Sequence, residues 1–202
     1  MDSDDALVLT FDPQTVDHLG ARMYSHLPNA VAELVANAYD ADAKHVAIGI
    51  GSADSISVSY DGHGMSRTDV ATKYLRIGRN RRRALDSSLT ESGKRRVSGK
   101  KGLGKLALFG IGKRVVLSTT RADSTAGVEI ELDYDAMMNA EGSYSPEETE
   151  FSSAEDRHGT TVTLSRLKRK TAIDAHKLAA SLSRLFDYAD ADFEIVVIAA
   201  DG

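Results

Sequence analysis

The chain has 202 residues, of which 42% are hydrophobic and 27% charged, and its formal net charge is −5. This composition fits a globular domain with a substantial core, and no apolar run reaches the roughly 18 residues that a membrane-spanning helix needs. The chain has no cysteine, which excludes disulfides and thiolate metal sites, and its acidic start does not resemble a secretory signal, so we expect a cytoplasmic protein with no membrane partner.

The first predicted elements lead up to a central helix. Residues 7–9 suit a short N-terminal arm or strand, and a first helix is predicted over 13–23. A second helix is predicted over 28–41, where Pro28 fits a first-turn position because its missing N–H costs nothing there.

The helix predicted over 28–41 is amphipathic. Glu33, Asn37 and Asp40 lie at i, i+4 and i+7 and form one polar stripe. The apolar side chains fall on the opposite face: Val31, Leu34, Val35 and Ala38. Taken alone, this pattern favours a surface helix with a solvated acidic face.

Two strands and a short helix follow. Residues 44–50 and 55–60 alternate between apolar and polar side chains, which predicts two half-buried strands in a hairpin. A short helix is predicted over 67–75 because Ser66 is a good N-cap and Asp69 completes a capping box.

Positive charge is concentrated in the next segment. Residues 76–105 hold eleven Lys and Arg but two acids, so this segment carries +9 and the rest of the chain −14. Such a field attracts the phosphates of a nucleotide or a nucleic acid. The alternative is a solvated charge run, and residues 78–98 are predicted to be a mobile loop.

The second half of the chain alternates strands with few helices. The predicted elements are a helix beginning within 102–112, strands over 115–119 and 127–132, a loop or insertion over 133–157, a strand over 160–164, a helix over 171–188 and a strand over 193–199. Helices mixed with mostly antiparallel strands predict an α+β two-layer sandwich, with helices on one face of the sheet, as one domain over 1–202.

Four polar features stand at the ends of apolar elements. The first is the stripe of Glu33, Asn37 and Asp40, and the second is Asp61-Gly62-His63-Gly64-Met65 after a strand. The third, Gly99-Lys100-Lys101-Gly102-Leu103-Gly104, opens a helix, and the fourth is Gly159-Thr160 at the start of a strand.

Together these features resemble the ATP-binding domain of the GHKL superfamily, which includes DNA gyrase B subunits, heat-shock chaperones of the ninety-kilodalton class, MutL and MORC proteins and histidine kinases. ELVANAYDA resembles E-x-x-x-N-x-x-D-A, and YDGHGM resembles D-x-G-x-G-M. GKKGLG resembles G-x-x-G-x-G, and GTTVTL resembles the glycine-threonine that enters a strand. All four occur in the order of the superfamily.

The resemblance implies where the adenine would bind. Asp61 would accept a hydrogen bond from the exocyclic amine of adenine, where guanine presents a carbonyl instead. Gly62 and Gly64, which precede Met65, would let the backbone approach the ligand. Thr160 would support Asp61 at the base, although it could equally be an ordinary strand residue.

The resemblance also implies where the phosphates would bind. Asn37 would offer a neutral oxygen to Mg²⁺, Glu33 would act as the general base on water, and Asp40 would shape the pocket. The glycine-rich turn would donate hydrogen bonds from its backbone N–H groups to the phosphates. The positive charges of Lys100, Lys101 and Lys105 would add to the attraction.

A phosphate loop of the Walker type is a competing interpretation of the glycine-rich turn. Residues 99–105 fit G-x-x-x-x-G-K, but Leu106 stands where a Ser or Thr is required. The preceding residues also do not read as a hydrophobic strand, so the sequence disfavours this interpretation.

The presence of Glu33 favours the hydrolysing branch of the superfamily over histidine kinases. By resemblance, the segment 76–105 would be a lid that closes over ATP, closure would accompany formation of a homodimer, and DNA is a candidate partner. A following domain would supply a lysine, so we expect this chain to be the N-terminal part of a longer protein with weak activity alone. A nucleotide-gated module without turnover and a kinase of the same fold stay open.

Overall fold

The structure is a computed structural model that describes residues 7–10, 26–51, 54–76, 89–98, 108–140, 143–154, 157–186 and 192–199. The helix predicted over 13–23 and the glycine-rich turn at 99–105 lie outside these described residues. The same holds for residues 77–88 of the predicted lid, whereas its residues 89–98 are described.

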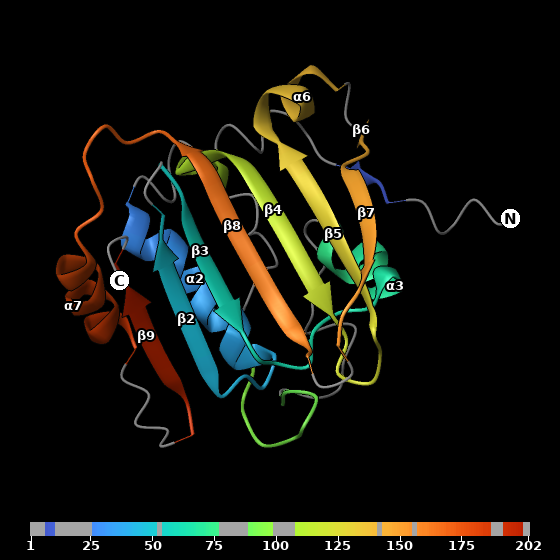
Figure 1. Cartoon of the computed structure of the whole chain (residues 1–202), viewed down its shortest axis with the longest axis horizontal. Coiled ribbons are helices and arrows are strands. Elements are labelled where there is room, and N and C mark those ends of the chain that lie inside the picture. Colours follow the sequence, from blue (N-terminus) through green and yellow to red (C-terminus); the bar gives the residue numbers. More distant parts are fainter. Residues whose placement is uncertain are drawn as a thin grey trace, which may run out of the picture.

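A seven-stranded sheet forms one layer (Figure 1). Its strands lie in the order β7-β5-β4-β8-β3-β2-β9. Every neighbouring pair is antiparallel except β2 and β9, which are parallel. The strands are β2 (His45–Ile50), β3 (Ile56–Tyr60), β4 (Gly112–Thr120), β5 (Ala126–Asp133), β7 (Glu147–Ser152), β8 (Gly159–Leu167) and β9 (Glu194–Ile198).

The other elements complete the fold. Among the described residues, the helices are α2 (Leu27–Asp40), α3 (Arg67–Asp69) with its continuation η1 (Val70–Tyr74), the turn η2 (Leu108–Gly110), α6 (Tyr134–Asn139) and α7 (Ala175–Leu185). The short strands β1 (Leu9–Thr10) and β6 (Ser143–Tyr144) form an antiparallel pair apart from the main sheet. In Figure 1, α2 and α3 lie behind the sheet and α7 lies beside β9.

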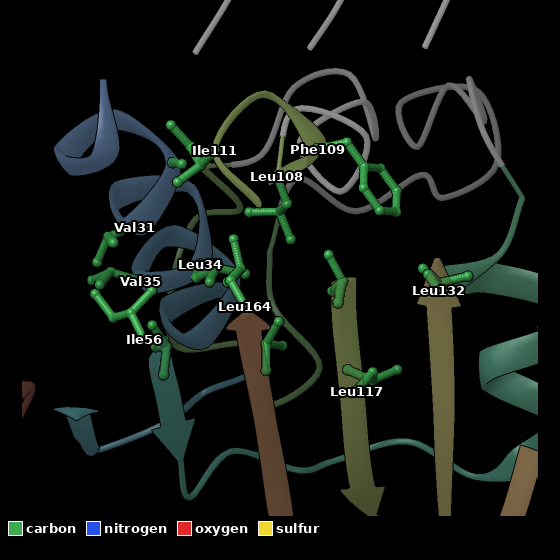
Figure 2. Packing of buried hydrophobic residues seen from close by; sticks show 14 of the residues in the cluster. Val31, Leu34, Val35, Ile56, Leu108, Phe109, Ile111, Leu117, Leu132 and Leu164 are labelled. Atoms are coloured by element: carbon green, nitrogen blue, oxygen red, sulfur yellow. The ribbon is translucent and has the colours of Figure 1, made fainter. Parts of the chain in front are cut away.

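The core lies between α2 and the sheet. Figure 2 shows Val31, Leu34 and Val35 of α2 facing Ile56 of β3 and Leu164 of β8. All five side chains are at most 3% exposed. Burial of this apolar stripe, at about 25 cal/mol per Å², is what fixes an amphipathic helix against a half-apolar sheet. The predicted α+β sandwich with a mixed, mostly antiparallel sheet is confirmed.

The short helix after β3 begins as predicted. The side chain of Ser66 accepts from the amide of Asp69, and the Asp69 carboxylate accepts from the amide of Ser66, which is a capping box. Partial burial alone would raise the pKa of Asp69, but the bonds from Lys73 and Ser66 outweigh it and lower the pKa to about 2.

The prediction of a loop or insertion over 133–157 is wrong. This stretch contains α6, β6 and β7. The side chain of Asp133 accepts from the amide of Ala136 and starts α6. Strand β7 reads EETEFS and is almost wholly exposed at the sheet edge, so it lacks the apolar alternation by which strands are found in a sequence.

Candidate functional site

The polar stripe of α2 divides into two parts. Glu33 and Asn37 are half-exposed, whereas Asp40 is buried. One carboxylate oxygen of Asp40 accepts two hydrogen bonds from Ser98, from the amide at 2.7 Å and from the hydroxyl at 2.9 Å. The helix therefore presents a carboxylate and an amide one turn apart, next to a carboxylate that holds another segment of the chain.

The glycines after β3 allow close contact between backbones. A Cβ on Gly62 would lie 2.5 Å from the carbonyl oxygen of Ala41, and one on Gly64, whose φ is +63°, would overlap the carbonyl of Thr120. The amide of His63 donates to the Ala41 carbonyl at 2.9 Å. These contacts join the end of β3 to the end of α2 and to the end of β4. The sequence predicts that these glycines allow close approach between the backbone and a ligand. In the structure they allow close approach between segments of the protein's own backbone.

Thr160 lies in the junction formed by these contacts. It is 4% exposed, and its hydroxyl is 2.8 Å from that of Thr119, which is 2% exposed. The Thr119 hydroxyl donates to the carbonyl of Gly159 and accepts from the amide of Met65, both at 3.0 Å. Sequence reasoning missed Thr119 because a threonine inside a strand carries no distinguishing pattern.

Asp61 lies on the other side of the sheet from α2. Its carboxylate accepts from the amides of Lys44 at 2.7 Å and His45 at 2.9 Å, and lies 2.6 Å from Nδ1 of His45. Burial alone would raise the pKa of Asp61, but the bonds from His45 and Lys44 outweigh it and lower the pKa. Asp61 lines a shallow hollow of about 410 Å³, and the same lining includes Ser59 and Thr161 as well as Thr119 and Thr160.

Strand alternation explains this placement. In β3 the side chains of Ile56 and Val58 are buried, and Tyr60 packs against the same core, so Asp61 takes the opposite side. The pattern D-x-G-x-G-M also has its aspartate two residues before the first glycine, and that position in this chain is Tyr60. Contact of Asp61 with adenine stays a prediction, and this geometry disfavours it.

A second hollow, of about 470 Å³, lies beside α3 and does not suit phosphate. Its lining charges pair with one another, Lys73 with Asp69 at 2.5 Å and Arg121 with Glu91. Asp123, the fifth charged residue, leaves the lining with one excess negative charge, which repels an anion.

Comparison with family models identifies the family. The family model described as "Histidine kinase-, DNA gyrase B-, and HSP90-like ATPase" matches residues 24–161. The chain belongs to this ATPase family. The match includes α2, the glycines after β3, and Thr160, and it confirms the predicted membership of the GHKL superfamily.

Two known proteins are similar to this GHKL domain, one in sequence and one in fold. A protein of Herpetosiphon aurantiacus, named "Putative type II restriction enzyme HgiDII", is 47% identical over 109 residues, which are 54% of this chain and 17% of that protein. The ATPase domain of Aquifex aeolicus MutL, in complex with ADP, superposes with a TM-score of 0.54 at 18% identity over 88% of this chain and 61% of that one. The chain thus spans less than two thirds of either relative.

The fold of this GHKL domain is that of the MutL ATPase domain. Among the described residues, no helix is long and apolar enough to cross a membrane. The predicted phosphate-binding residues from Gly99 to Lys105 lie outside the described residues, but they follow Ser98, which Asp40 holds at the end of α2.

Proposed function

We propose that this domain binds Mg·ATP on the polar stripe of α2 and hydrolyses it slowly. The observation that carries the proposal is the placement of Glu33 and Asn37. Both are half-exposed on a helix whose opposite face is fixed in the core, and the end of that helix is joined to Thr160 through the loop 61–65. A rigid helix of this kind holds reacting groups in place.

Each side chain has a role in the proposed reaction. Asn37 offers an amide oxygen, a neutral hard donor of the kind that suits Mg²⁺, which is usually held by few protein ligands together with phosphates. Bound Mg²⁺ would neutralise charge on the phosphates. Glu33, one turn before Asn37, would accept a proton from the water that attacks the γ-phosphate. The turn Gly99–Lys105 would donate backbone N–H groups to the phosphates.

The junction around Thr160 suits the exocyclic amine of a base. Since the Thr119 hydroxyl donates to the carbonyl of Gly159, the contact between the two threonines uses the hydroxyl hydrogen of Thr160. Thr160 is then left with acceptor capacity only. An acceptor in this junction favours adenine, which carries an amine, over guanine, which carries a carbonyl at the same position.

Lid closure, homodimer formation and action on DNA belong to the same proposal. They are supported by family membership and by the relative named as a restriction enzyme. In this proposal the basic segment 76–105 closes over ATP, two domains associate, and hydrolysis releases them. A further domain completes the site, so turnover by this chain alone is slow.

Calorimetric titration tests the nucleotide site. Mg·ATP should bind to the wild type, and Asn37→Ala should weaken binding at least about 100-fold, because the substitution removes the proposed metal ligand. Asn29→Ala is the matched control, since Asn29 is a half-exposed amide on the first turn of the same helix. Equal binding by all three proteins, or none by the wild type, contradicts the proposal.

Turnover is tested separately. Glu33→Ala should lower the rate of phosphate release at least about 100-fold while the Kd for Mg·ATP changes less than about threefold, because a general base acts only in the chemical step. Phosphate release is measured with the ATP concentration well above the Kd. An unchanged rate in Glu33→Ala would favour a nucleotide-gated module without a catalytic Glu33.

A further inference from the structure

The described part of the basic segment, residues 89–98, is fastened to the end of α2. The hydroxyl of Thr90 donates to the Asp42 carboxylate at 2.6 Å, and Ser92 donates to the same carboxylate from its amide at 2.9 Å and its hydroxyl at 2.7 Å. Ser98 donates twice to Asp40. Five hydrogen bonds to two carboxylates are charge-assisted, and such bonds are about twice as strong as neutral ones.

Arg95 fastens the middle of the same segment. Its guanidinium donates to the carbonyl of Ala43 at 2.6 Å and lies 4.6 Å from the ring centre of Tyr39 and 5.3 Å from that of Phe193. The two rings meet edge to face at 5.3 Å. An arginine placed over aromatic rings is attracted by their electron-rich faces. The segment is therefore held both at the end of α2 and at the start of β9.

The backbone conformation and the pKa of Asp42 both reflect its contact with Thr90 and Ser92. Its φ is +59°, in the left-handed region, where an aspartate is tolerated better than most side chains. Burial alone would raise the pKa of Asp42, but the hydrogen bonds from Thr90 and Ser92 outweigh it and lower the pKa. Thr90 itself is 6% exposed, so its bond to Asp42 is sheltered from water. A solvated charge run would show neither feature.

We propose that Asp42 and Thr90 are positioning residues for the nucleotide site. By holding residues 89–98 on the end of α2, they place Ser98 against Asp40, one turn beyond Asn37. The inference rests on the proposed function and adds to it a contact on which nucleotide affinity depends, although neither residue touches the nucleotide. Lys94 and Arg96 of the same segment stay exposed, so the segment is held by hydroxyls and backbone amides and by Arg95.

Substitution of Thr90 tests the inference most cleanly. Thr90→Val keeps the shape of the side chain and removes the donor to Asp42, so we expect about tenfold weaker binding of Mg·ATP, because the competent arrangement is populated less. Thr90→Ser keeps a hydroxyl and should bind within about twofold of the wild type. Asp42→Ala removes the acceptor of all three hydrogen bonds and should weaken binding at least as much as Thr90→Val.

Asp174→Ala is the matched control. Asp174 is the N-cap of α7 and its carboxylate also accepts a backbone hydrogen bond, from the amide of Lys177, but among the described residues none of its hydrogen bonds involves the segment 89–98. It should leave the Kd unchanged. Trypsin cleavage after Lys94, Arg95 and Arg96 should accelerate in Thr90→Val and Asp42→Ala and not in Asp174→Ala.

The outcomes separate the two proposals. If the wild type binds Mg·ATP and Thr90→Val and Asp42→Ala bind equally well, the positioning role is wrong and the proposed function stands. If Asp174→Ala weakens binding as much as they do, the effect is general destabilisation, which also overturns the role. If the wild type does not bind, the proposed function fails and the positioning role fails with it.

Discussion

On β3, Ile56 and Val58 point toward α2 and are at most 1% exposed, whereas Ser57 and Ser59 on the other face are half-buried. Strand β8 repeats the arrangement. Thr160, Val162 and Leu164 are buried, and Thr161 and Thr163 are half-buried on the outer face, where Thr161 lies 3.0 Å from the hydroxyl of Ser59.

The difference between the inner face of the sheet, which packs against α2, and its outer face decides which polar residues can take part in the proposed site. Neighbouring residues of a strand point to opposite faces of the sheet, so the side chain of Thr160 is buried on the same face as Val162 and Leu164, whereas that of Thr161 is half-buried on the outer face beside Ser59. A motif identifies residue types along the chain, and the strand register decides which of them face the helix.

The largest effect expected from this comparison is on stability. Ile56→Ala should lower the free energy of unfolding by about 3 kcal/mol, because it leaves a cavity against α2. Ser57→Ala, one residue later, should change it by less than about 0.5 kcal/mol. Urea unfolding of both variants measures this, and equal midpoints would mean that the two faces are not distinct.

The next effect is on binding. Thr160→Val should weaken binding of Mg·ATP about tenfold, since the acceptor proposed for the base amine is lost. Thr161→Val is the matched control on the outer face and should bind like the wild type. Calorimetry measures both, and equal losses would show that the effect passes through the strand and not through a base contact.

The smallest effect on binding is expected for Asp61, which lies on the outer face of the sheet. Asp61→Asn should change the Kd for Mg·ATP less than about threefold, because the side chain is engaged with Lys44 and His45 on the outer face. A complete loss of binding would restore Asp61 as the base-selecting residue and contradict its placement here.

The same variant has a pH signature. The folded pKa of Asp61 is below its ordinary value of 3.8, so the carboxylate stabilises the fold above pH 3.8, and this contribution is lost as the pH falls through the lower, folded value. Acid unfolding of the wild type should therefore show a steeper loss of stability below pH 4 than Asp61→Asn, as followed by circular dichroism.

Much of the fold could be predicted because apolar periodicity survives in the sequence. The stripe of α2 and the alternation of β2 and β3 have the periods of 3.6 and 2 that burial imposes. Strand β7 was not predicted because an acidic strand at the edge of the sheet has no such period. The predicted helix over 171–188 is shorter, Ala175–Leu185, since Asp174 caps its start.

The residue types of the candidate site could be proposed from the sequence, but their arrangement in space could not. Helical spacing places Glu33 and Asn37 on one face of the helix, and the resemblance to the GHKL superfamily is what assigns them to a nucleotide site. The inward position of Tyr60, the pairing of Thr119 with Thr160 and the bond from Thr90 to Asp42 depend on contacts between distant parts of the chain, the last spanning 48 residues. Local patterns carry no information about such contacts.

The parallel pairing of β2 with β9 has a consequence for how the chain is made. It joins residue 45 to residue 194, 149 positions apart, so all residues up to β9 must leave the ribosome before that edge of the sheet can close. Contacts of such long range make folding slow, and until they form β2 presents an unpaired edge to other chains. During synthesis the helix carrying Glu33 and Asn37 therefore exists beside an incomplete sheet, and we expect a chaperone that shields strand edges to improve the yield of folded protein.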